Sequence, residues 1–218
     1  MSISPELVCI VDDDQSVRRA VRRLFKSAGY SAEIFASAED YLAREVFDGP
    51  SCLVLDVRMP GLNGLGLQEA LEPRGAGEQI IFLTGHGDVP TCKQAMKKGA
   101  VDFLVKPFDD EELLGAVQRA LDRSEEYLRK RAERREARAR IDKLTPREFE
   151  VLRFVITGLL NKQIAAELKT AEKTIKVHRG RAMQKLGATS VPDLVRLTQR
   201  AGIVPAIPSH RHKARFSA

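Results

Sequence analysis

Residues 52–64 read CLVLDVRMPGLNG, and this segment decides the fold class. Four apolar residues are followed by Asp56 and then by Met59, Pro60 and Gly61, residue types that favour a tight turn. A continuous apolar run indicates a strand covered on both faces, because a half-exposed strand alternates polar and apolar residues. The segment therefore predicts a buried strand that ends in a carboxylate, with a turn that leaves this carboxylate exposed.

Similar runs occur before and after this one, separated by amphipathic helical stretches, and four of the five runs are continuous rather than alternating. The predicted strands cover residues 7–11, 31–35, 52–55, 80–83 and 101–105. Strands that alternate with helices predict an α/β domain of the (βα)5 type, a doubly wound parallel sheet with helices on both faces. In such sheets, binding sites lie at the carboxyl ends of the strands.

Charged and polar side chains are found at these carboxyl ends. Asp12 and Asp13 follow the first strand, and Asp56 ends the third. Thr84 ends the fourth strand, and Lys106 follows the fifth. Carboxylates that share a pocket raise one another's pKa unless a cation is present, and Mg²⁺ is a hard cation that prefers oxygen ligands. We therefore predict that these five residues form one metal-dependent site.

This set of groups is suited to phosphoryl transfer. A carboxylate oxygen attacks phosphorus in line, while a metal ion and an ammonium group neutralise charge on the transferring oxygens. Asp56 is the predicted nucleophile, because its strand lies in the middle of the sheet. Asp12 and Asp13 are predicted to hold Mg²⁺. Lys106 is predicted to pair with one phosphoryl oxygen, and Thr84 to donate its hydroxyl to another.

The remainder of the chain is basic. Residues 1–122 carry a net charge of −7 and residues 123–218 a net charge of +13, which favours a polyanion as partner of the second part. Residues 122–143 lack Gly and Pro and are predicted to form a helical linker. A heptad-like spacing from Leu114 to Leu128 leaves a short coiled-coil dimer as an alternative.

An all-α domain of four short helices is predicted over residues 144–204. Thr145, Pro146 and Glu148 have the spacing of a capping box with proline at the first helical position. Asn161 and Ser190 are predicted to cap the second and fourth helices. Short helices joined by tight turns indicate a helix-turn-helix domain. Residues 205–218 are predicted to be disordered.

The third of these helices, which ends before Gly187, is rich in Lys and Arg and is predicted to enter the major groove of double-stranded DNA. Lys and Arg bind phosphates or guanine edges, whereas Thr and Val contact a phosphate or a thymine methyl group. The predicted DNA contacts are Lys162, Lys173, Thr174, Lys176, Val177, His178, Arg179, Arg181 and Lys185.

Together, these motifs resemble those of FixJ-type response regulators of the NarL/LuxR class. The matching segments are VDDD at 11–14, LDVRMPGLNG at 55–64, TGHGDVP at 84–90, GAVDFLVKPF at 99–108, LLNKQIAAEL at 159–168 and KTIKVHRGRAMQKLG at 173–187. The resemblance implies a receiver domain over residues 1–121, a linker over 122–143 and a LuxR-type helix-turn-helix domain over 144–204.

The same resemblance implies roles for particular residues. A sensor histidine kinase would phosphorylate Asp56, and the backbone carbonyl of Arg58 would be a further metal ligand. Phe103 would be an aromatic switch residue, and Lys106–Pro107 would be a cis peptide. His86 is expected to be an ordinary loop residue of this family.

Phosphorylation would then favour a homodimer with higher affinity for DNA, which would control transcription together with RNA polymerase. No apolar run approaches the ~18 residues of a membrane helix, so a cytoplasmic protein without a membrane partner is expected. Beyond its own phosphorylation and dephosphorylation, no enzyme activity is expected.

Two other functions are compatible with parts of the sequence. The first is a phosphorylation-independent DNA-binding transcription factor with a silent receiver domain. The second is a nucleotide-binding enzyme, since GLNGLGLQE follows a predicted strand. The enzyme is disfavoured, because Glu69 occupies the place of the third glycine of the dinucleotide-binding pattern.

Overall fold

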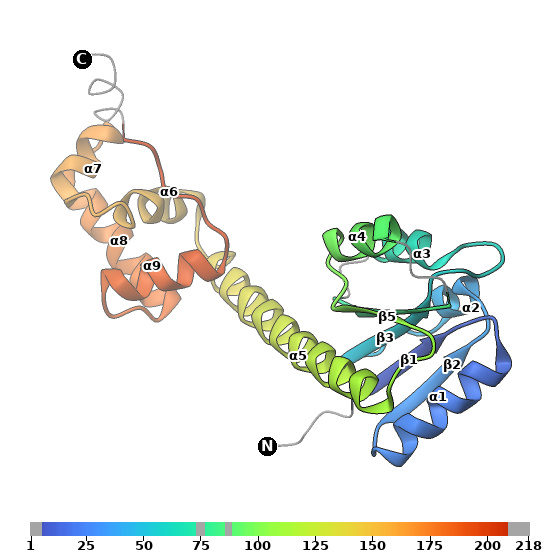
Figure 1. Ribbon diagram of the computed structural model, residues 1–218. Helices are drawn as coiled ribbons and strands as arrows, with labels where there is room; N and C mark the ends of the chain where they lie inside the picture. The colour runs from blue at the N-terminus through green and yellow to red at the C-terminus, as the bar shows by residue number, and fades with distance from the viewer. Residues whose placement is uncertain (1–5, 73–76, 86–88, 209–218) are drawn as a thin grey trace. The chain divides into compact units, whose positions relative to one another are not determined.

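The computed structural model describes residues 6–72, 77–85 and 89–208, and the chain divides into two compact units, Met1–Arg129 and Lys130–Ala218. The first unit contains a parallel five-stranded sheet with the strand order β2-β1-β3-β4-β5 (Figure 1). The strands are β1 Leu7–Val11, β2 Ser31–Phe35, β3 Ser51–Asp56, β4 Gln79–Thr84 and β5 Asp102–Val105. The predicted doubly wound fold is confirmed, because β3 is central and each strand lies within one residue of its predicted bounds.

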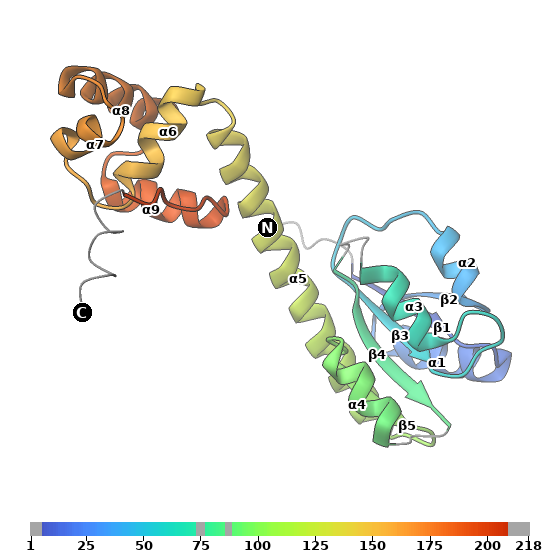
Figure 2. The same cartoon turned by 90° about the horizontal axis from the view of Figure 1, so that it is seen from above.

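Helices cover both faces of the sheet (Figure 2). They are α1 Gln15–Ser27, α2 Ala38–Ala43, α3 Gly64–Leu71, α4 Val89–Lys97 and α5 Asp110–Ile141. On one face, α1 and α5 bury side chains such as Phe25 and Leu121 in one apolar cluster. On the other, α2, α3 and α4 bury residues such as Tyr41, Leu67 and Ala95 in a second cluster. Because both faces are covered, the carboxyl edge of the sheet is left to carry the polar residues.

The heptad-like residues of α5 are used inside the first unit. Val117, Leu121 and Ser124 are at most 2% exposed. Val117 and Leu121 pack in the apolar cluster of α1, and the Ser124 hydroxyl accepts a hydrogen bond of 3.0 Å from the backbone N–H of Ser51. The coiled-coil alternative is therefore wrong for these residues, since their common face already packs against the sheet.

The second unit contains the end of α5 and the four predicted helices α6 Pro146–Val155, α7 Asn161–Glu167, α8 Glu172–Leu186 and α9 Val191–Arg200. Ala137 and Ile141 of α5 are buried in the apolar core that these helices share. The capping box at Thr145 is confirmed, as is the end of α8 at Gly187, whose φ is +64°. In the described part of the chain, no helix is long and apolar enough to cross a membrane.

The predicted cap of α7 is wrong. Leu160 occupies the N-cap position, and Asn161 is the first helical residue. The Gln163 side chain accepts a hydrogen bond of 2.8 Å from the Leu160 backbone N–H and so replaces a side-chain cap. The Asn161 side-chain oxygen Oδ1 instead accepts a hydrogen bond of 3.0 Å from Arg179 Nη1.

The chain after α9 returns to α6. The Ala206 backbone N–H donates to the Arg153 carbonyl at 2.9 Å, and Arg153 Nε donates to the Val204 carbonyl at 3.0 Å. The segment predicted to be disordered, residues 205–218, thus contains one residue near its start, Ala206, that is hydrogen-bonded to α6. Residues 209–218 lie outside the described residues, so for them disorder stays a prediction.

Candidate functional site

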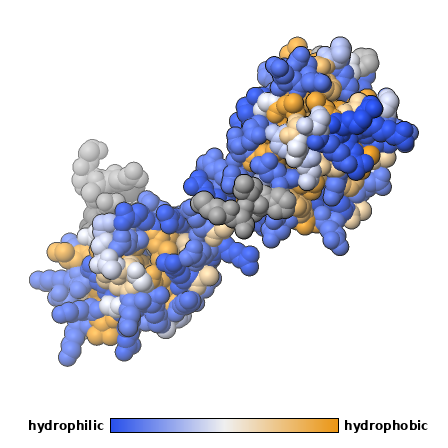
Figure 3. Space-filling view, turned by 90° about the horizontal axis from the view of Figure 1, so that it is seen from below, coloured by the Kyte–Doolittle hydropathy of each residue, from blue (hydrophilic) through white to orange (hydrophobic). Residues whose placement is uncertain are grey.

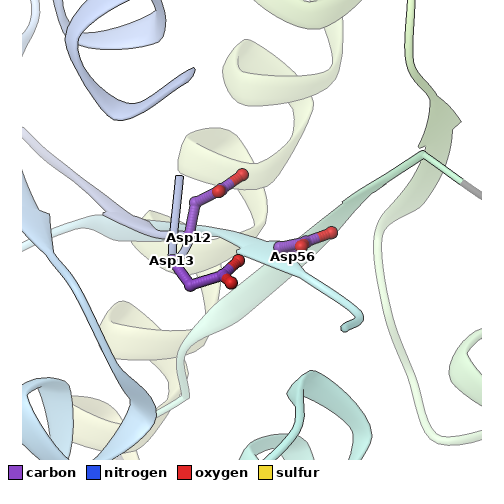
Figure 4. Close-up of side chains that lie close together, drawn as sticks. All are labelled: Asp12, Asp13 and Asp56. Atoms are coloured by element: carbon purple, nitrogen blue, oxygen red, sulfur yellow. The ribbon is translucent and has the colours of Figure 1, made fainter. Parts of the chain in front are cut away.

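Three carboxylates meet at the carboxyl edge of the sheet (Figure 4). Asp12 and Asp13 follow β1, and Asp56 ends the neighbouring strand β3. One carboxylate oxygen from each of the three lies within 4.8 Å of the others. Because this donor set consists only of oxygens and carries up to three negative charges, it fits a hard divalent cation such as Mg²⁺.

Asp12 is the most firmly held of the three. It is 2% exposed, whereas Asp13 is exposed to solvent. Its Oδ1 accepts a hydrogen bond of 2.8 Å from the Asp14 backbone N–H, and its Oδ2 accepts one of 2.6 Å from Lys106 Nζ. Lys106 follows β5, so its ammonium group joins the carboxylates from the other side of the sheet edge, as the sequence predicts.

Asp56 lies close to both of the other carboxylates and to Lys106. Its Oδ1 accepts a hydrogen bond of 2.9 Å from the Val57 backbone N–H and lies 3.7 Å from Lys106 Nζ. Burial raises the pKa of Asp56, Lys106 lowers this pKa, and the Asp12 and Asp13 carboxylates raise it further. The prediction of an exposed carboxylate is wrong, because Asp56 is only 8% exposed between these neighbours.

This environment predicts that Asp56 destabilises the metal-free fold. We expect Asp56→Asn to raise the melting temperature in EDTA at pH 7 by about 4 °C, or about 1 kcal/mol in a unit of this size. Since the pKa of Asp56 is raised in the folded state, the folded protein binds a proton at this carboxylate more readily than the unfolded chain does. The wild type therefore gains stability as pH falls through the raised pKa, and the advantage of Asn declines. Differential scanning calorimetry across pH checks this, and Mg²⁺ is expected to shrink the difference.

The loop that follows Asp56 packs closely against the strand. The Gly64 backbone N–H donates to the Val57 carbonyl at 3.0 Å, and the Leu62 backbone N–H donates to Glu39 Oε1 at 3.1 Å. Arg58 lies in this loop with an exposed side chain. A cavity of about 510 Å³ adjoins the loop and is lined by Val57, Arg58, Met59, Pro60, Asn63, Leu65 and Thr91.

Gly64 is required by this close packing. A Cβ atom at Gly64 would lie 2.2 Å from the Asp56 carbonyl oxygen, which is a backbone atom with little freedom to move. We expect Gly64→Ala to destabilise the fold by about 1–3 kcal/mol, measured by urea unfolding. Gly115→Ala in α5 is the matched control, since a Cβ there meets only the flexible Arg119 side chain at 3.4 Å. It should be neutral or stabilising by up to about 1 kcal/mol.

Thr84, the predicted hydroxyl donor, and Phe103, the predicted aromatic switch residue, lie on β4 and β5. Thr84 is fully buried at the end of β4, one residue beyond the partner of Asp56, and its carbonyl accepts a hydrogen bond of 2.7 Å from the Lys106 backbone N–H. Phe103 in β5 is partly buried, and its ring centroid lies 6.1 Å from that of Phe82. The Lys106–Pro107 peptide is cis, as the resemblance implies. His86 lies outside the described residues.

The second unit presents a basic helical face. The exposed residues of α8 are Lys173, Lys176, Val177, Gly180, Arg181 and Gln184, besides Glu172 and Lys185 near its ends. Positions 173, 176, 177, 180, 181 and 184 follow a helical repeat and therefore lie along one face. Lys162 of α7 is also exposed, and Thr174 is partly buried. Hydrophilic residues cover much of the visible surface of each unit (Figure 3).

Three of the predicted DNA-contact residues are partly buried or hydrogen-bonded to other residues of the second unit. Arg179 is partly buried and donates to Asn161, as described above. Lys185 Nζ donates to the buried Glu148 Oε2 at 2.7 Å. This hydrogen bond, those from Thr145 and the charge of Lys185 lower the pKa of Glu148. His178 is partly buried, and its Nδ1 lacks a hydrogen-bond partner among the described residues. Lys185 and Arg179 therefore stabilise the domain, whatever else they contact.

Sequence reasoning missed two residues that hold the acidic site. Arg18 Nη1 in α1 donates to the Asp12 carbonyl at 2.5 Å, and Glu39 in α2 accepts from the loop after Asp56. Neither contact follows from composition or periodicity, because each depends on where a helix packs. The sequence signal for Arg18 is its position one helical turn after the cap residue Asp14, from which a long side chain can reach back to β1.

Comparison with known families assigns both units. Residues 8–118 match the response regulator receiver domain, and residues 142–198 match the bacterial regulatory proteins of the LuxR family. The described acidic site lies in the first match, and the basic face of α8 lies in the second. Each match agrees with the fold of the unit that contains it.

Relatives extend over both units. Nodulation protein W of Bradyrhizobium diazoefficiens is 48% identical over 199 residues, which cover 90% of this chain and 87% of that protein. Transcriptional regulatory protein FixJ of Azorhizobium caulinodans is 44% identical over 199 residues, which cover 91% of this chain and 94% of that protein. The solved structure of response regulator StyR has a TM-score of 0.75 with 44% identity, covering 90% of this chain and all of that one. The chain therefore belongs to the two-component response regulators that carry a receiver domain and a LuxR-type DNA-binding domain.

Proposed function

We propose that Asp56 is the phosphoacceptor of this response regulator and that its phosphorylation controls DNA binding. The observation that carries the proposal is the meeting of Asp12, Asp13, Asp56 and Lys106 at one sheet edge. The phosphodonor is a phosphohistidine of a sensor histidine kinase. An Asp56 carboxylate oxygen attacks phosphorus and forms an O–P bond. The bond between phosphorus and the histidine nitrogen breaks, and its electron pair leaves with the imidazole.

The residues around Asp56 have separate roles in this proposal. The Val57 N–H and Lys106 act on Oδ1, which leaves Oδ2 as the attacking oxygen. Asp12, Asp13, Asp56 and the Arg58 carbonyl would hold Mg²⁺, which supplies charge neutralisation for the transferred group when bound. Lys106 exchanges its present partner for a phosphoryl oxygen, since its amino group already lies between Asp12 and Asp56. The receiver thus catalyses only its own phosphorylation and dephosphorylation.

The switch follows from a new dianion at the sheet edge. The Thr84 hydroxyl donates to a phosphoryl oxygen, and Phe103 moves further inward beside Phe82. These shifts change the relative stability of two packings of the neighbouring surface, so phosphorylation changes their populations. The favoured state is a homodimer that brings two α8 helices to double-stranded DNA.

DNA recognition is assigned to α8, with Lys162 of α7 as a phosphate contact. The contact residues proposed are Lys162, Lys173, Thr174, Lys176, Val177, His178, Arg179, Arg181 and Lys185. The exposed members, above all Lys176 and Arg181, lie on the free face of the helix. FixJ of Azorhizobium caulinodans is a transcriptional regulatory protein, which supports control of transcription by this chain. We further propose a cytoplasmic location and RNA polymerase as a partner.

A binding experiment separates this function from that of a transcription factor with a silent receiver. A duplex is first selected from random DNA with the wild-type chain, and its affinity is measured with and without Mg²⁺ and beryllofluoride, a phosphoryl mimic. We expect beryllofluoride to raise both DNA affinity and the dimer fraction in sedimentation velocity. Unchanged affinity and mass, with beryllofluoride bound, would support the silent receiver.

A further inference from the structure

Arg18 connects α1 to the end of β1. Its guanidinium Nη1 donates a hydrogen bond of 2.5 Å to the Asp12 carbonyl, and the side chain is partly buried. Asp14 caps α1 by accepting hydrogen bonds from the backbone N–H groups of Ser16 and Val17. Two contacts with α1 therefore fix the short segment between β1 and α1. Asp14 caps the helix at one end of the segment, and Arg18 binds the Asp12 carbonyl at the other.

The contacts of Asp12 leave one group for Arg18 to fix. The Asp12 N–H donates to the Phe35 carbonyl at 3.4 Å. Its two carboxylate oxygens accept hydrogen bonds from the Asp14 N–H and from Lys106, as described above. The Asp12 carbonyl is the remaining polar group of this residue, and Arg18 is its hydrogen-bond donor.

The direction of the Asp12 carbonyl determines the position of the Asp13 backbone. A carbonyl, the following N–H and both adjoining Cα atoms lie in one plane, so fixing the Asp12 carbonyl fixes the peptide that leads to Asp13. Among the described residues, the exposed Asp13 carboxylate makes no hydrogen bond or ion pair. Its position next to Asp12 and Asp56 thus depends on its backbone.

We propose that Arg18 is a positioning residue for the divalent cation site: it orients the Asp12–Asp13 peptide so that the Asp13 carboxylate joins those of Asp12 and Asp56. This inference rests on the proposed function, which assigns Mg²⁺ to these carboxylates. Groups that orient metal ligands from outside alter affinity strongly, and their loss weakens binding by about 10–100-fold. Because Arg18 acts through a carbonyl, we expect the lower end of this range.

Calorimetric titration of the full chain with MgCl₂ alone tests the proposal. Arg18→Met keeps an unbranched side chain but removes every donor, and we expect it to raise the Mg²⁺ Kd about tenfold. Arg19→Met is the matched control, since Arg19 is the same residue type at the next position of α1 and is exposed. It should leave the Kd within about twofold of wild type, a small effect for an exposed charge.

Two further measurements separate positioning from general stability. In the metal-free protein, the backbone amide NMR signals of Asp13 and Asp14 should shift in Arg18→Met and stay in place in Arg19→Met. If Arg18→Met fails to fold, Arg18→Gln takes its place, because its polar amide is two atoms too short to reach the carbonyl. It should show the same weakening.

The results distinguish failure of this inference from failure of the proposed function. A folded Arg18 variant with wild-type Mg²⁺ affinity would overturn the positioning role and leave the receiver function intact. Equal weakening of Mg²⁺ binding in Arg18→Met and Arg19→Met would also overturn the positioning role, since the net charge of the protein would then explain the effect. A wild-type chain that binds no Mg²⁺ would overturn the proposed function and this inference with it.

Discussion

Asp56→Asn is expected to abolish phosphorylation of the chain by its kinase and by a small donor such as acetyl phosphate. The amide oxygen of Asn is a far weaker nucleophile than a carboxylate oxygen. Asp12 is not expected to substitute for it, since Asp12 is assigned to Mg²⁺ and is held in place by hydrogen bonds from Lys106 and the Asp14 N–H. Intact-protein mass spectrometry after incubation with Mg²⁺ and donor measures the incorporated phosphoryl group.

The matched control for this variant is Asp122→Asn in α5. Asp122 is exposed, and its Oδ1 accepts a hydrogen bond of 3.0 Å from Gln118 Nε2, which an Asn oxygen can also accept. Phosphorylation of Asp122→Asn should proceed at the wild-type rate. A folded Asp56→Asn protein that is phosphorylated as fast as the wild type would rule out Asp56 as the acceptor.

The second large effect is expected from the double variant Lys176→Ala and Arg181→Ala. Both residues are exposed on one face of α8, and a good contact of this kind contributes about 1–3 kcal/mol. Their joint loss should weaken binding to the selected duplex on the order of a hundredfold. Fluorescence anisotropy over a range of salt concentrations measures the affinity and shows how many phosphate contacts are lost.

A second pair of substitutions controls for the loss of charge. Arg131→Ala with Arg135→Ala removes the same charge from exposed positions of α5 in the same unit. This pair should change affinity for the selected duplex only slightly. If both pairs weaken binding equally, recognition would depend on the net charge of the unit, and α8 would have no special role.

The sheet and the acidic site were predictable because each follows from a short-range pattern and one rule of topology. Apolar runs identify the strands, and parallel strands bring Asp12, Asp56 and Lys106 to one edge. Burial of Asp56 was not predictable from its turn, because it depends on neighbours from β1 and β5. Dependence on neighbouring side chains also explains why the predicted cap at Asn161 is wrong. Side chains of Arg179 and Gln163 decide the outcome there, and a cap preference is too weak to outweigh them.

The buried residues near the C-terminal end of α5 have a practical consequence for dividing the protein. Ala137 and Ile141 belong to the apolar core of the second unit, although the sequence places that domain at residues 144–204. A recombinant fragment starting at residue 144 would lack both side chains and leave a hole facing water. Starting near residue 130 would retain them, which makes that the better choice for crystallising the DNA-binding part alone.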